Sequence, residues 1–277
     1  AIYNLASKRR HPIPVFAEMG SVNPVLIFPK KLEKEYAELA KQYAKSITVG
    51  SGQFCTNPGL IISFESDHFD LFIKKLVEEI EQISPSCMLH PNIYNAYNSG
   101  LEKIRQNSNV FELTREINIT DKNCPKHVIS HVSAEKFMED KSLQHEVFGP
   151  CSLIVTCQDD KEMYAVIESL EGQLTGTVLA ENNDTFLTQE IIDALELKVG
   201  RIIFNGVPTG VEVCESMTHG GPYPASTDSR FTAVGINSIK RWLRPVSYQD
   251  FPQSLLPEEL KNGNPLNIKR NINGIIS

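Results

Sequence analysis

Long apolar runs and an excess of basic residues are both missing from this sequence of 277 residues. No apolar run approaches the roughly 18 residues that a membrane-spanning helix needs, and the first residues show no signal-peptide core. The 27 Lys and Arg are outnumbered by 34 Asp and Glu, so the net charge is -7, which disfavours binding to the phosphate backbone of nucleic acids. We therefore expect a cytoplasmic protein with neither a membrane nor a nucleic acid as its partner.

Closely spaced cysteines and glycine-rich phosphate loops are also lacking. No Gly-x-Gly-x-x-Gly follows a predicted strand and no Gly-x-x-x-x-Gly-Lys-Ser/Thr occurs, so the sequence holds no recognisable nucleotide cradle. A chain of this length that is 41% hydrophobic and has no secretion signal does not depend on disulfides, so we expect reduced thiols. The spacing typical of zinc sites, two to four residues, separates none of the six cysteines, and we expect no metal: they are Cys55, Cys87, Cys124, Cys151, Cys157 and Cys214.

Amphipathic helical patterns alternate with short β-branched runs over most of the chain. Apolar residues recur every three or four positions in residues 31–47 and 67–83, as they do along one face of a helix. Strands that alternate with such helices predict an α/β fold, a mostly parallel sheet covered by helices on both faces. The further helical patterns cover residues 91–106, 161–170, 185–195 and 234–242, and the strand candidates are residues 25–28, 60–64, 127–132, 152–156, 176–180 and 201–204.

The character of the sequence changes at residue 244. Residues 244–277 contain four prolines and alternate polar with apolar residues only near their end, where residues 266–271 are a possible edge strand. Such a segment has too little apolar surface to fold alone and commonly packs on another subunit or domain. We expect one domain over residues 1–243 and an extended C-terminal oligomerisation arm over residues 244–277, which together predict a homo-oligomer.

One cysteine stands in a loop framed by glycines. Residues 50–59 read Gly-Ser-Gly-Gln-Phe-Cys-Thr-Asn-Pro-Gly, and glycines on both sides of Cys55 let the backbone take tight angles. Such a loop can present a thiol as a nucleophile, but most cysteines are small buried apolar residues. The ordinary role suits the other five cysteines, which lie beside strand-like or turn-like sequence. For Cys55 both interpretations stay open at this point.

Two carboxylates and a histidine lie in further loops. Glu18 stands in an apolar stretch before a predicted strand, where burial would raise its pKa and let it act as a general base, although a surface contact is the simpler role. Glu146 precedes Phe148 and a Gly-Pro turn, and taken alone this is only a turn. His219 opens a His-Gly-Gly loop, which either approaches a ligand closely or simply connects two elements.

A pair of histidines could be mistaken for a metal site. His127 and His131 are four residues apart, but the sequence between them is strand-like. Two histidines on one strand face are expected to be solvated rather than to share a metal.

The combination of these loops resembles the aldehyde dehydrogenase superfamily over nearly the whole chain. Each motif alone is weak, but three in the family's order are hard to obtain by chance. Residues 205–226 and 244–250 look like one branch, the α-ketoglutaric semialdehyde (2,5-dioxovalerate) dehydrogenases. The three motifs are Glu18-Met19-Gly20-Ser21-x-Asn23-Pro24, Gly52-Gln53-x-Cys55 and Glu146-x-Phe148-Gly149-Pro150.

The resemblance implies a role for each loop residue. Cys55 would attack the aldehyde and pass through a thiohemiacetal to a thioester, and Glu18 would activate the water that hydrolyses it. This role needs an elevated pKa at Glu18 rather than a salt bridge. Glu146 would hold the ribose of NAD or NADP, and Phe148 would pack near the nicotinamide. Phe54, Thr56 and His219 are implied substrate contacts.

The resemblance also implies that the coenzyme-binding domain of such enzymes is absent from these residues. We therefore expect residues 1–277 alone to bind coenzyme weakly and to oxidise aldehydes too slowly to measure. The choice between NAD and NADP stays open, because the residue that meets the adenosine ribose belongs to that other half. Two alternatives remain, a cofactor-independent thiol esterase or acyl-transferase that uses Cys55 and Glu18, and a non-catalytic module that dimerises through the arm.

Overall fold

The structure is a computed structural model that describes residues 1–276. It separates into two compact units, the first spanning Ala1–Ser238 and the second beginning at Ile239. No helix among the described residues is long and apolar enough to cross a membrane.

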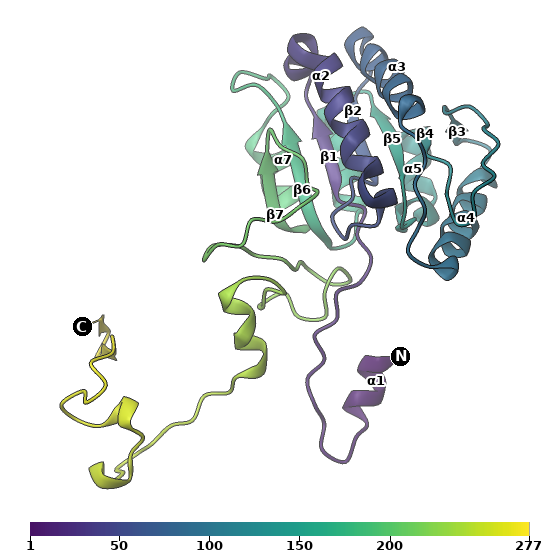
Figure 1. The fold of residues 1–277 in the computed structure, drawn as a ribbon. Helices are drawn as coiled ribbons and strands as arrows, with labels where there is room; N and C mark the ends of the chain where they lie inside the picture. Colours follow the sequence, from purple (N-terminus) through teal and green to yellow (C-terminus); the bar gives the residue numbers. More distant parts are fainter. Residues whose placement is uncertain (277) are drawn as a thin grey trace. The chain divides into compact units, whose positions relative to one another are not determined.

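A seven-stranded sheet forms the centre of the first unit (Figure 1). The strand order is β3-β4-β5-β2-β1-β6-β7, and every neighbouring pair is parallel except β3 with β4. Each long strand matches a strand candidate from the sequence, while the two-residue β3 is too short to leave a pattern. The strands are β1 (Pro24–Ile27), β2 (Leu60–Phe64), β3 (Phe111–Glu112), β4 (Val128–Ser133), β5 (Cys151–Cys157), β6 (Gln173–Leu179) and β7 (Val199–Phe204).

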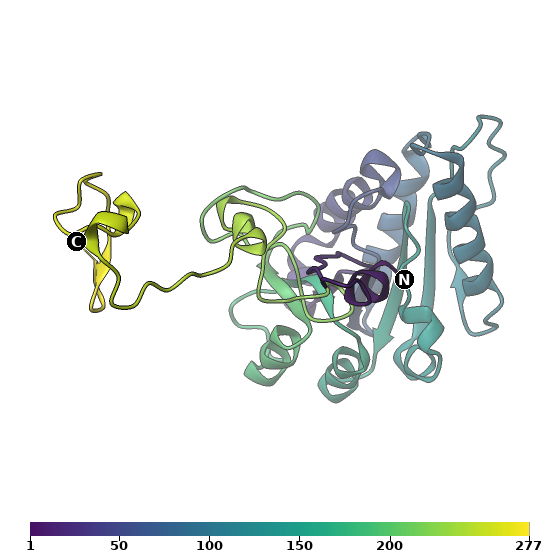
Figure 2. The ribbon, with the colours of Figure 1, turned by 90° about the horizontal axis from the view of Figure 1, so that it is seen from below.

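Helices cover both faces of this sheet (Figure 2). Helices α2 (Pro29–Thr48) and α3 (Asp67–Gln82) bury one apolar cluster. A second cluster is buried by α5 (Ala134–Glu139), α6 (Asp160–Ser169) and α7 (Gln189–Glu196). Because both faces are covered, β1, β2 and β6 are buried along their whole length, as expected for central parallel strands. The predicted α/β class is confirmed. The remaining α-helices are α1 (Ile2–Ser7) and α4 (Pro91–Arg105).

The register of the sheet brings distant loops to one edge. Pro24 at the start of β1 pairs with Leu60 at the start of β2, and Leu60 pairs with Leu153 near the start of β5. Since parallel strands run in one direction, the loops that precede β1, β2, β5 and β6 meet at the amino-terminal edge. These loops carry Glu18, Cys55 and Glu146.

Two predictions about cysteine and histidine are wrong. Cys87 and Cys124 form a disulfide, because their two loops lie side by side, with the Met88 N–H donating to the Asn123 carbonyl at 2.9 Å. His127 is buried and His131 is half-buried, since strand β4 is covered by the neighbouring segments. His131 Nε2 lies 2.7 Å from the Thr156 hydroxyl.

The second unit differs in detail from the expected arm. The predicted helix over residues 234–242 is a 3₁₀ segment, Ile236–Trp242, that spans the boundary between the units. The predicted strand over residues 266–271 is wrong, because pairing begins only at Asn271, where β8 (Asn271–Ile272) forms a hairpin with β9 (Ile275–Ile276). Two further 3₁₀ turns, Gln253–Leu255 and Glu258–Leu260, precede this hairpin.

Candidate active site

The loop before Cys55 has an unusual backbone. Three consecutive residues adopt positive φ, at 57° for Gly50, 55° for Ser51 and 65° for Gly52. A Cβ at Gly52 would overlap with the backbone of Gly149 and Pro150, so only glycine lets the cysteine loop pack so closely on the loop before β5. The tight angles expected from the sequence are confirmed, and they leave Cys55 exposed.

Asn23 anchors the same loop through hydrogen bonds to its backbone. Its side chain is fully buried, and its amide donates to the carbonyls of Cys55 at 3.0 Å and Asn57 at 2.9 Å. Its carbonyl accepts from Ser21 at 2.9 Å and Thr175 at 3.0 Å. A buried amide with all these groups satisfied fixes the position of the Cys55 backbone.

Cys55, His219 and Glu18 come together above this loop. The Cys55 Sγ lies 3.4 Å from His219 Nε2, and the same nitrogen lies 3.1 Å from Glu18 Oε2. Glu18 reaches this position because residues 17–19 pair with the backbone of residues 225–227. A thiol beside an imidazole that contacts a carboxylate is an arrangement that activates the sulfur for covalent catalysis.

His219 carries a positive charge in this arrangement. Its side chain is 5% exposed, and its pKa is raised to about 9 by its hydrogen bonds to Cys55 and then Glu18, against the opposing effect of burial. The implied role of Glu18 as a carboxylate outside any salt bridge therefore needs correction, because Glu18 forms an ion pair with His219. The imidazolium offers a counter-charge to both the sulfur and the carboxylate.

The same three groups could bind a metal. A sulfur, an imidazole nitrogen and a carboxylate oxygen, all within 4.8 Å of one another, are donors that suit zinc. The expectation that the protein works without a metal therefore stays a prediction, and the assays below include a chelator.

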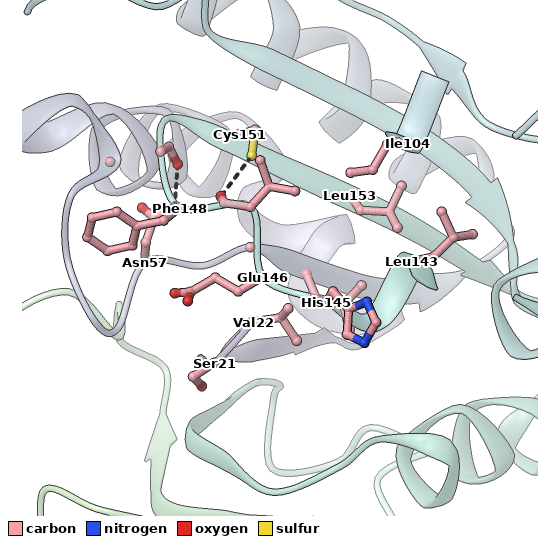
Figure 3. Close-up of a pocket in the computed structure, with 15 residues that line it drawn as sticks. Ser21, Val22, Asn57, Ile104, Leu143, His145, Glu146, Phe148, Cys151 and Leu153 are labelled. Carbon is pink, nitrogen blue, oxygen red and sulfur yellow. Dashed lines mark hydrogen bonds between the residues drawn. The ribbon is translucent and has the colours of Figure 1, made fainter. Parts of the chain in front are cut away.

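Glu146 and Phe148 line one pocket beside the cysteine loop, together with Ser21, Gly52 and Asn57 (Figure 3). Glu146 is an exposed residue, but partial desolvation of its carboxyl raises its pKa to about 7, with a smaller contribution from the charge of Glu18. The backbone of Ser21 donates a hydrogen bond to this carboxyl and opposes the rise. Within the described residues Glu146 forms no ion pair, so the carboxylate has capacity to accept hydrogen bonds from a ligand.

Replacing Glu146 with glutamine should stabilise the fold at alkaline pH. The folded-state pKa lies above the ordinary value of 4.5, so the folded protein holds the proton more tightly and loses stability as the pH rises from about 4.5 to 7. Glu146→Gln removes this loss, and its Tm should exceed that of the wild type at pH 8 but not at pH 4. Calorimetry at both pH values is the measurement, and an equal Tm difference at the two would contradict the raised pKa.

The other predicted residues differ in how close they lie to the surface. Phe54 is 37% exposed beside Cys55, whereas Thr56 is buried at 1%, so Phe54 is better placed to contact a substrate.

Cys151 and Cys157 are buried, and burial raises the pKa of Cys151 to about 12. Cys214 is exposed, which corrects the expectation that every cysteine except Cys55 is a buried apolar residue.

Sequence reasoning missed three polar residues near this edge. Asn23 belongs to the first motif, but the motif does not indicate that its amide anchors the Cys55 loop. Gln173 accepts the Val22 N–H at 2.6 Å and the Ser21 hydroxyl at 3.0 Å. Arg201 interacts electrostatically with Cys55. None has a local signal, because each acts on a residue more than 30 positions away in sequence.

Comparison with known proteins gives curated relatives of high similarity. The chain is 42% identical over 285 residues to the α-ketoglutaric semialdehyde dehydrogenase of Acinetobacter baylyi, covering 100% of this chain and 53% of the relative. It is 43% identical over 272 residues to α-ketoglutaric semialdehyde dehydrogenase 2 of Azospirillum brasilense, covering 98% and 51%. The chain thus spans about half the length of the curated relatives it matches.

A solved structure and a family model agree with the sequence similarity to these relatives. The betaine aldehyde dehydrogenase of Staphylococcus aureus, solved in complex with NAD+, superimposes with a TM-score of 0.66 over 81% of this chain and 44% of its own, at 14% identity, which shows the shared fold alone. The family model described as aldehyde dehydrogenase family matches residues 1–240. The resemblance inferred from the three motifs is thereby confirmed, and this chain belongs to the aldehyde dehydrogenase family.

Proposed function

We propose that these residues form the thiol-bearing catalytic part of an NAD(P)-dependent aldehyde dehydrogenase that oxidises α-ketoglutaric semialdehyde to 2-oxoglutarate. The observation that carries the proposal is the cluster of Cys55 Sγ, His219 Nε2 and Glu18 Oε2, whose atoms lie within 4.8 Å of one another. The identity of 42–43% to two α-ketoglutaric semialdehyde dehydrogenases supports the choice of substrate.

Cys55 is the proposed nucleophile. Its sulfur adds to the aldehyde carbon, and the thiol proton leaves to solvent, because His219 is already protonated and supplies the counter-charge for the thiolate. The new oxyanion meets the backbone N–H of Cys55, which donates to no other residue in the described chain. A backbone N–H at that position stabilises the negative charge as the thiohemiacetal forms.

Glu18 acts in the second half of the reaction, as a carboxylate that its ion pair with His219 keeps ionised and so able to accept a proton. Once the acyl group is held on Cys55 as a thioester, Glu18 takes a proton from a water molecule, and the resulting hydroxide attacks the acyl carbon. The bond between the acyl carbon and the sulfur then breaks, the acid leaves, and Glu18 returns its proton to the Cys55 sulfur. A side-chain exposure of 29% at Glu18 gives water access to its carboxylate.

Glu146 and Phe148 are the residues that would hold the coenzyme. The Glu146 carboxylate has acceptor capacity to spare for ribose hydroxyls, and Phe148 offers an aromatic face in the same pocket, so the residues present fit a nicotinamide ribose. When bound, the nicotinamide would accept the hydride released from the aldehyde carbon. Two residues contact only one end of a dinucleotide, so residues 1–277 alone should bind it weakly.

Residues 244–277 are the proposed oligomerisation arm. Large apolar side chains are exposed along this segment, including Val246 at 56%, Leu255 at 68% and Ile275 at 71%. Apolar side chains that stay exposed along an extended segment favour packing on another subunit.

The thiol chemistry can be tested without a coenzyme by using a p-nitrophenyl ester. Wild-type residues 1–277 should release one equivalent of nitrophenol in a burst, with the acyl group on Cys55, and Cys55→Ser should abolish it. Glu18→Gln should keep the burst and slow steady turnover by about 100-fold, the typical contribution of a general base. Mass spectrometry of the quenched protein locates the acyl group.

A matched control is Glu135→Gln, because Glu135 lies on α5 with its side chain 68% exposed. This variant should keep both the nitrophenol burst and the steady turnover. Loss of burst and turnover together in Glu18→Gln would give Glu18 a structural role, and loss of both on adding EDTA would point to a metal. Oxidation is measured with the protein at its full natural length, where acylation without NAD(P)H formation would favour the thiol esterase instead.

A further inference from the structure

Arg201 lies near the beginning of strand β7, beside the loop that carries His219. Its neighbour Gly200 packs on Gly220 so closely that a Cβ at Gly200 would overlap with the Gly220 carbonyl. Gly220 directly follows His219, so this contact holds the beginning of β7 against the His219 loop. The arginine side chain extends from this point and interacts electrostatically with Cys55.

The guanidinium of Arg201 lacks the acidic partner that a half-buried arginine usually has. Within the described chain no Asp or Glu forms an ion pair with it. Its Nη2 donates to the carbonyls of Pro208 at 3.3 Å and Gly210 at 3.4 Å, while its buried Nε has no partner. Burial lowers the pKa of Arg201, and Cys55 is the group that opposes this effect. A desolvated guanidinium with unused donors favours binding of an anion.

We propose that Arg201 binds the carboxylate of an anionic aldehyde while the aldehyde carbon lies over Cys55. The carbonyls of Pro208 and Gly210 hold one side of the guanidinium, and the remaining terminal nitrogen, Nη1, has no partner among the described residues. Arg201 is therefore a specificity-determining residue, which selects substrates that carry a negative charge at the end opposite the aldehyde.

The length of the proposed substrate agrees with this geometry. In a five-carbon semialdehyde, four carbon–carbon bonds separate the aldehyde from the carboxylate, which gives roughly 5 Å along the chain. Gly200 packs on Gly220, and His219, the residue before Gly220, lies 3.4 Å from the Cys55 sulfur. Arg201, the next residue of β7, can therefore meet the far end of a substrate of this length. This inference rests on the proposed function, since it assumes that Cys55 is the residue that meets the substrate.

Two alkylating agents of equal length test the proposal without a coenzyme. The probes are 5-iodopentanoate, which is anionic, and 5-iodopentanamide, which is neutral, and peptide mapping of residues 1–277 gives the alkylation rate of Cys55 for each. The wild type should prefer the anionic probe. Arg201→Met should reduce the rate ratio by about tenfold, the effect of losing a charge-assisted hydrogen bond, and Arg201→Lys should retain part of it.

The control is Arg115→Met, because Arg115 is 72% exposed and pairs with Glu81 at 2.8 Å; it should leave the ratio unchanged. If Arg201 only supports the loop at residues 208–210, both probes will slow equally in Arg201→Met and the ratio will stay constant, which overturns the proposal. Labelling of wild-type Cys55 without anion preference would overturn it while leaving the proposed nucleophile intact. Failure of both probes to label Cys55 would overturn the proposed function together with this inference.

Discussion

His219→Ala is expected to slow the alkylation of Cys55 by iodoacetamide at pH 7 by roughly fivefold. An opposite charge 3.4 Å from the sulfur stabilises the thiolate by about 1 kcal/mol even in a solvent-exposed setting. The thiolate is the form that reacts with iodoacetamide, so removing the imidazolium removes reactive sulfur. Time-resolved peptide mapping gives the rate at each cysteine.

Cys214 is an internal control for this experiment. It is exposed like Cys55, but its sulfur contacts the Ser216 hydroxyl at 3.4 Å instead of an imidazole. Its rate should be the same in the wild type and in His219→Ala, and lower than that of wild-type Cys55. Equal rates at Cys55 and Cys214 in the wild type would contradict an activated thiol.

The pH dependence separates a charge effect from a steric one. His219 has a pKa raised to about 9, so the imidazolium is present at pH 7 and is lost as the pH rises through about 9. The difference between wild type and His219→Ala should therefore be largest near neutral pH and should shrink above pH 9. A difference that persists at pH 10 would mean that the histidine acts by position alone.

The parts of the fold that the sequence predicts are those with a local pattern. Helix α3 repeats apolar residues every three or four positions, and β2 is a continuous apolar run, so both are visible in a short window. The glycine-framed loop at residues 50–59 is also local, because each positive φ needs a suitable residue at that position.

The parts that the sequence does not predict depend on contacts between distant residues. Cys87 and Cys124 are 37 residues apart, and nothing near either cysteine indicates its partner. Cys55 and His219 are 164 residues apart, so the resemblance could imply that His219 contacts the substrate but not that it pairs with the sulfur. Arg201 lies in a strand-like run that gives no sign of function. Its proposed role depends on the His219 loop, which packs against β7 and is distant in sequence.

Gly52→Ala is expected to destabilise the protein by about 4 kcal/mol or more, a size reached only by substitutions that force a clash or strain. A Cβ at Gly52 would overlap with the backbone of Gly149 and Pro150, and neither backbone segment can move without disturbing the start of β5. For a domain of this size, the loss corresponds to a decrease in Tm of about 10 °C. Thermal unfolding followed by circular dichroism gives the value.

Gly210→Ala separates the clash from the cost of positive φ. Gly210 has a φ of +92°, but an added Cβ there would meet nothing within 4 Å, so only the conformational cost of about 1–2 kcal/mol remains. If the two variants lose equal stability, the close contact between the Cys55 loop and the loop before β5 does not constrain Gly52. If Gly52→Ala is much less stable than Gly210→Ala and its Cys55 also reacts more slowly with iodoacetamide, the contact both supports the fold and fixes the position of the thiol. The thiol is affected because the segment that the added methyl group displaces leads directly into Gln53, Phe54 and Cys55.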